Sequence, residues 1–107
     1  MDLDKYKGKI REFADERDWD QFHDPKNLSM ALSAEIGELL DIFQWLTSDQ
    51  SKNLSDKDLK LVKEELGDIM IYLIRLSDKL GIDLEQAVID KIKINEEKYP
   101  IELSKGN

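Results

Sequence analysis

Residues 64–73 read EELGDIMIYL, and a similar pattern stands 30 residues earlier, where residues 35–39 read EIGEL. Each stretch contains an acid-x-Gly-acid motif followed by apolar residues. Side chains three residues apart lie on one face of a helix, so each motif would place two carboxylates side by side. Two such motifs on consecutive helices, each with an interior glycine, are a far more specific signal than one. The acids are Glu35, Glu38, Glu65 and Asp68.

On a helical wheel these four acids fall in the middle of apolar stripes. The acids of the earlier motif share their face with Leu39 and Ile42, and those of the later motif share theirs with Ile69 and Tyr72. A buried carboxylate without a partner costs several kcal/mol or takes up a proton. We therefore expect another group to compensate these charges.

Buried ion pairs are one explanation, but the wheels place few cations near these faces, with Arg75 and Lys79 toward the far end of the later helix. Four converging carboxylates would instead suit one or two hard divalent cations. Oxygen-only ligands favour Mg²⁺, with Mn²⁺ as a possible substitute. We favour the metal hypothesis. A di-iron bundle is excluded because it needs Glu-x-x-His on two helices, and the one histidine, His23, lies between helices.

The pattern around these motifs predicts four helices joined by short loops. Asp24, Ser55 and Asp83 are the expected N-caps of the last three, and Gly81 is expected to end the third. The alternating pattern of β-strands is absent. We therefore predict an all-α fold, an antiparallel four-helix bundle completed by oligomerisation. The expected ranges are 4–18, 25–46, 55–81 and 83–100.

The composition limits the partners that this chain can have. Its 107 residues predict a single domain over 1–107, and its net charge of −8 argues against a nucleic acid polymer or an anionic membrane as partner. The absence of cysteine excludes disulfides and zinc–thiolate sites. The N-terminus has no signal-peptide pattern, and no apolar run approaches about 18 residues, so we expect a cytoplasmic protein.

The later helix is apolar on every face over residues 69–74. A helix that is apolar all round needs to be surrounded, and the rest of so short a chain hardly suffices. Met70, Ile71 and Ile74 point away from the acids on the wheel, so we expect a second copy to cover them. A symmetric dimer or a dimer of dimers would do so.

Outside the motifs, the candidate binding residues are cations and aromatic side chains. Lys91, Asn95 and Lys98 follow one side of the last predicted helix, where phosphate binding and an ordinary solvated surface are the alternatives. Tyr72 lies on the acid face and Trp45 at its edge, where stacking on a base competes with a role in the core.

The two motifs together resemble the all-α nucleoside triphosphate pyrophosphohydrolases of the MazG type, and within them the dCTP pyrophosphatase branch. The resemblance covers nearly the whole chain, and all four motif acids match. Ile10 departs from it, because some members of this branch carry histidine near that position, which leaves the preferred base and sugar open. The stretches that carry the resemblance are residues 16–23, 35–39, 43–45 and 64–73, together with Lys91, Asn95 and residues 98–100.

The resemblance implies magnesium-dependent cleavage of a nucleoside triphosphate to the monophosphate and pyrophosphate, by a homotetramer. It places the metal ligands on the four motif acids. The implied nucleotide contacts are Trp19, Trp45, Tyr72, Lys91 and Asn95, with His23 as a further one. In such an assembly Trp19, His23 or Lys98 would complete a neighbour's site.

The leading hypothesis is therefore an enzyme that removes unwanted deoxynucleoside triphosphates, with a dCTP-like substrate. Glu35 or Glu38 would also orient the attacking water, Lys91 and Lys98 would meet phosphates, and Asn95 would bind a phosphate or the sugar. Trp19, Trp45 and Tyr72 would enclose the base. The alternatives are a non-enzymatic helical dimerisation or adaptor module with structural acids, and a related hydrolase of another nucleotide.

Overall fold

The computed structural model describes residues 1–106, and within that range it contains helices and no strand. The predicted all-α class is confirmed. In chain order the elements are α1 (Leu3–Glu16), the 3-10 turn η1 (Asp20–Phe22), α2 (Pro25–Phe43), α3 (Ser48–Ser51), α4 (Asp56–Lys79), α5 (Leu84–Lys98) and α6 (Ile101–Ser104).

Short polar side chains begin the long helices, as the sequence predicts. Asp24, Ser55 and Asp83 each accept a hydrogen bond from the backbone N–H three residues on, which satisfies a donor that the helix itself leaves free. Gly81 follows the C-terminal end of α4 with φ at +67°, the left-handed conformation in which glycine meets no steric penalty.

The end of α2 differs from the prediction. The helix stops at Phe43 rather than Leu46, because Thr47 forms a capping box with Gln50 and starts the short helix α3. Trp45 therefore lies in a turn instead of on a helix face. A second short helix, α6, follows Pro100.

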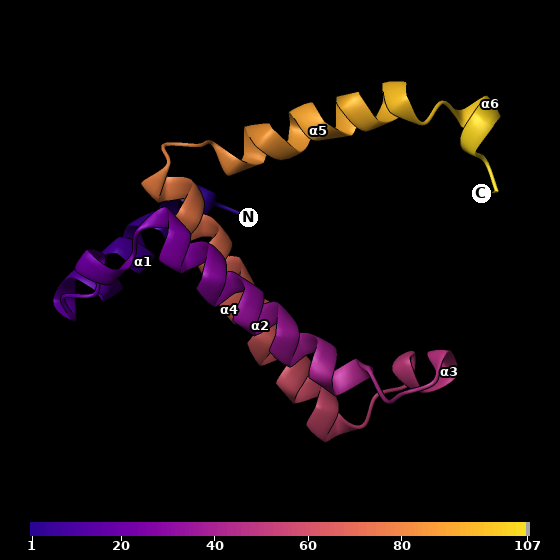
Figure 1. The fold of residues 1–107 in the computed structure, drawn as a ribbon, viewed down its shortest axis with the longest axis horizontal. Coiled ribbons are helices and arrows are strands. Elements are labelled where there is room, and N and C mark those ends of the chain that lie inside the picture. Colours follow the sequence, from indigo (N-terminus) through magenta and orange to yellow (C-terminus); the bar gives the residue numbers. More distant parts are fainter. Residues whose placement is uncertain (107) are drawn as a thin grey trace.

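Helices α2 and α4 run antiparallel along one another, and α1 packs across the C-terminal half of α4 (Figure 1). Their fully buried apolar side chains are Ala14, Leu28 and Ile74, one from each of the three helices. The core of the chain is therefore small and sits where α1, α2 and α4 meet. Ile74 belongs to this core, so the expectation that a second copy covers it is wrong.

Helix α5 leads away from the α2–α4 pair rather than folding back on it (Figure 1). The radius of gyration is 17.2 Å, whereas a compact chain of this length would have about 13 Å. Val88, Ile89, Ile92 and Ile94 of α5 are each between 41% and 52% exposed. The single chain therefore does not close a four-helix bundle, and completion by further copies stays a prediction.

Among the described residues, no helix combines the length and the apolar character that a membrane span needs.

Candidate metal centre

Three carboxylates meet between α2 and α4. Glu35 and Glu38 come from α2 and Glu65 from α4, and one oxygen of each lies within 4.8 Å of those of the other two. Both motifs stand near the middle of their helices, so antiparallel packing brings them opposite each other. These three residues form what we call the acidic cluster.

Two oxygens of the acidic cluster are buried without a hydrogen-bond partner. They are the Oε2 atoms of Glu35 and Glu65, although each residue as a whole is only half-buried. Leaving a buried polar atom unsatisfied costs about 1–3 kcal/mol, and more when it carries charge. Such atoms are typical of ion-binding sites, and carboxylate oxygens are the donors that a hard cation prefers. The acidic cluster could therefore hold a metal ion.

The surroundings of both half-buried carboxyls raise their pKa values. The pKa of Glu65 rises to about 7 because its carboxyl lies against that of Glu35, is partly shielded from water and faces the charge of Glu38. For Glu35, contact with Glu65 lowers the pKa, but burial and the charges of Glu38 and Asp68 outweigh that contact and leave the pKa raised. The carboxyls of the cluster therefore hold a proton to a higher pH than isolated carboxyls do.

Asp68, the fourth predicted ligand, lies outside the acidic cluster but close to it. Its side chain is exposed, and its charge still contributes to the raised pKa values of Glu35 and Tyr72. No ion pair within residues 1–106 involves Asp68 or a member of the cluster. The ion-pair alternative therefore finds no support, because the nearest candidates, Arg75 and Lys79, pair with Asp20 instead.

The two predicted stacking residues of this face differ in their surroundings. Tyr72 is half-buried, and its pKa is raised by that burial and by the charges of Glu35 and Asp68, so it lies beside the acidic cluster. Trp45 is 86% exposed in the turn after α2. Trp45 therefore does not lie at the edge of the acid face, as the sequence predicted, because α2 ends before it.

Trp19 and His23 flank η1 and form a small aromatic group with α1. The Trp19 ring meets Phe13 edge-on with centroids 5.5 Å apart, and the His23 ring lies 6.2 Å from Trp19. His23 Nδ1 accepts a hydrogen bond from Arg75 Nε at 3.2 Å. The sequence prediction missed this role of Arg75, although the helical wheel could have flagged an arginine seven residues after Asp68 on the same face.

The three polar candidates of the last long helix are not brought to the acidic cluster within one chain. Lys91, Asn95 and Lys98 are exposed on α5, which extends away from the α2–α4 pair (Figure 1). The ammonium group of Lys98 lies 5.4 Å from the centre of the Tyr99 ring. A role for these residues at the cluster requires that they reach another copy's site.

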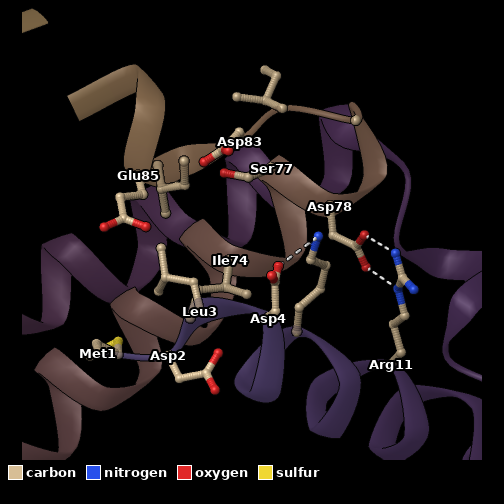
Figure 2. A pocket seen from close by; sticks show the side chains of 14 residues that line it. Met1, Asp2, Leu3, Asp4, Arg11, Ile74, Ser77, Asp78, Asp83 and Glu85 are labelled. Carbon is tan, nitrogen blue, oxygen red and sulfur yellow. Dashed lines mark hydrogen bonds and ion pairs between the residues drawn. The ribbon is translucent and has the colours of Figure 1, made fainter. Parts of the chain in front are cut away.

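A hollow of about 390 Å³ lies away from the acidic cluster, between the start of α1 and the connection from α4 to α5 (Figure 2). Figure 2 shows that Arg11 of α1 donates two hydrogen bonds to the carboxylate of Asp78 of α4 at the side of this hollow. This pair holds the pKa of Asp78 below its usual range and ties α1 to α4. The hollow is therefore a junction between helices and not part of the candidate centre.

The raised pKa of Glu65 gives a pH dependence of stability. Between about 4.5, its ordinary pKa, and about 7, the metal-free folded chain binds more protons than the unfolded chain. The free energy of unfolding should therefore fall as pH rises through this window. We expect urea denaturation in EDTA to show this fall in the wild type, and a smaller fall of the unfolding free energy in Glu65→Gln. Added Mg²⁺ should stabilise the wild type by an amount that increases as pH rises. Equal slopes in the two proteins would contradict the assignment.

The fold and the site together define a class: a helical protein with an oxygen-only acidic centre between two antiparallel helices. The model of the MazG-like family matches residues 30–107, which include both acidic motifs and α5. The chain therefore belongs to the MazG-like family.

The chain is also similar to named proteins. It is 45% identical to dCTP pyrophosphatase 1 of Mus musculus and 43% identical to that of Homo sapiens, in each case over 98 residues that make up 90% of this chain and 58% of the relative. The chain thus spans somewhat more than half the length of these mammalian relatives. A crystal structure of a pyrophosphatase from Archaeoglobus fulgidus superposes with a TM-score of 0.88 at 40% identity, covering 94% of both chains.

Proposed function

We propose that this chain is a magnesium-dependent nucleoside triphosphate pyrophosphohydrolase that converts a dCTP-like nucleotide to its monophosphate and pyrophosphate. The observation that carries the proposal is the acidic cluster, in which two helices hold three carboxylates together with two buried, unsatisfied oxygens. The names of the mammalian relatives support the substrate class, and the archaeal structure supports the type of reaction.

Glu35, Glu38 and Glu65 would hold the Mg²⁺, with Asp68 close enough to join them. The donor set fits, because it consists of oxygen atoms and carries enough negative charge for a divalent cation. When bound, Mg²⁺ would supply charge neutralisation at phosphate oxygens and make a water molecule more acidic. Glu38, the exposed member of the cluster, or Glu35 would orient the attacking water.

The nucleotide would extend from the acidic cluster along the face of α4. Tyr72 follows Asp68 by one turn and would contact the base or sugar, and Trp19 and His23 stand near the next turn. Trp45, Lys91, Asn95 and Lys98 would act from a second copy or after a change in the turn that carries Trp45. Lysines contributed in this way would offset the net charge of −8 that otherwise repels a triphosphate.

We propose that the working form is a homo-oligomer, a dimer or a tetramer. The small core, the radius of gyration of 17.2 Å and the exposed apolar side chains of α5 support this proposal. Neighbouring apolar side chains that are exposed together often mark a protein–protein interface. The expected cytoplasmic location stays a prediction.

A panel of nucleoside triphosphates assayed with and without Mg²⁺ tests the function. We expect pyrophosphate and the monophosphate from dCTP or a modified dCTP, no product in EDTA, and recovery with Mg²⁺ or Mn²⁺. Release of inorganic phosphate instead of pyrophosphate would contradict the reaction. If no nucleotide is cleaved and the chain still self-associates, the adaptor alternative is favoured.

A further inference from the structure

Among the described residues, Arg75 of α4 is the one charged residue that is buried as a whole, at 3% exposed. A guanidinium taken out of water is costly unless its donors find partners. Its Nη2 donates to Asp20 Oδ1 at 2.7 Å and its Nε donates to His23 Nδ1 at 3.2 Å, while Nη1 lies 3.7 Å from Asp78 Oδ2. The two hydrogen bonds both reach the segment around η1, which lies more than 50 residues away in sequence.

The hydrogen bond to His23 determines the chemical form of the imidazole. Arginine can only donate, so Nδ1 must be the unprotonated nitrogen, and the neutral ring then carries its hydrogen on Nε2. That Nε2–H donor has no partner among residues 1–106. The pKa of His23 is lowered by burial and by the positive charges of Arg75 and Lys79, which outweigh the opposing charge of Asp20.

The position of Arg75 relates this segment to the acidic cluster. Arg75 follows Asp68 by seven residues, which places both on one face of α4 about 10 Å apart along the helix axis, with Tyr72 between them. The segment that Arg75 holds therefore stands at the end of the face on which the carboxylates lie. Trp19 belongs to the same segment and lies next to the His23 ring.

We propose that Arg75 is a positioning residue, which clamps the segment from Trp19 to His23 against α4 and fixes His23 with a free Nε2–H donor directed to an acceptor on the nucleotide. This inference rests on the proposed function for the identity of the ligand. The clamp itself is a property of the free chain and can be tested without substrate.

The first experiment is ¹⁵N NMR of the imidazole in the metal-free and nucleotide-free protein. The chain has one histidine, so its ring signals are unambiguous. We expect the Nε2–H tautomer alone in the wild type, a mixture of tautomers with a pKa nearer the ordinary value in Arg75→Met, and a mixture in Arg75→Lys, which keeps the charge. Arg11→Met is the matched control, because Arg11 binds Asp78 in the same network without touching His23, and it should leave the ring signals unchanged.

A wild-type ring with its hydrogen on Nδ1, or with mixed tautomers, would overturn the clamp even if no variant folds. So would an Arg75→Lys or Arg75→Met protein with ring signals identical to those of the wild type. Both outcomes are independent of any enzymatic activity.

The second experiment links the clamp to the nucleotide. We expect Arg75→Met to raise KM for dCTP about tenfold, the loss of roughly one well-placed hydrogen bond, with kcat within about threefold of the wild type. Arg11→Met should leave KM unchanged. An unchanged KM in an Arg75→Met protein whose tautomers are mixed would refute the substrate role. A wild type that cleaves no triphosphate would refute the proposed function, and with it the ligand of this inference, while the tautomer result would still decide the clamp.

Discussion

Glu65→Gln is expected to lower kcat for dCTP by at least about 100-fold while leaving the fold intact. The substitution keeps the shape of the side chain but removes one of three charges that converge within 4.8 Å, so Mg²⁺ would lose a ligand and its charge compensation. It also removes a carboxyl whose pKa is raised to about 7, so the metal-free protein should not lose stability at pH 8. Pyrophosphate release at saturating Mg²⁺ and dCTP measures the first effect, and urea denaturation in EDTA measures the second.

Glu64→Gln is the matched control for this experiment. Glu64 is the preceding residue on α4, carries the same charge and is exposed outside the cluster. Its variant should keep kcat within about twofold of the wild type, because surface substitutions away from such features have small effects. A Glu65→Gln protein with full magnesium-dependent activity would show that the acidic cluster is not the metal centre.

Ile92→Glu is expected to dissociate the oligomer and to abolish most of the activity with it. Ile92 is 52% exposed in the single chain, and its apolar neighbours Val88 and Ile89 are exposed beside it on α5. A carboxylate buried in an interface without a partner costs several kcal/mol, which would weaken association by about 100-fold or more. Analytical ultracentrifugation across a range of concentrations, with activity assayed in parallel, measures both effects.

Lys93→Gln is the control for the change of charge, because it also makes the chain more negative by one unit on the same helix. Lys93 is exposed and has no ion-pair partner among residues 1–106, so the variant should sediment like the wild type. If Ile92→Glu remains fully associated, the exposed side of α5 is not the interface.

Local chemistry made much of this fold predictable from the sequence. Asp24, Ser55 and Asp83 start their helices by capping backbone N–H groups three residues on, and such contacts depend on a few neighbouring residues alone. The meeting of the acidic motifs was predictable for the same reason, since acids in the middle of an apolar stripe have to face whatever that stripe packs against.

Features that depend on distant parts of the chain were not predictable in this way. Arg75 reaches His23 and Asp20 across more than 50 residues, and no spacing rule announces such a contact. The course of α5 depends on surfaces that the single chain does not provide. The early end of α2 has a local cause that was hard to predict for another reason. The apolar stripe through Leu46 favours a longer helix, whereas the capping box of Thr47 favours a new helix, and the structure follows the capping box.

The outward course of α5 has a consequence for the behaviour of newly made chains. A single copy would expose the apolar side chains of α5 to water, and proteases and chaperones bind such segments. The lifetime of the protein should therefore increase with its concentration in the cell. If a neighbour's lysines are needed at the carboxylates, specific activity should also climb with protein concentration and decay after dilution. Below the concentration at which copies associate, the triphosphate would then not be hydrolysed.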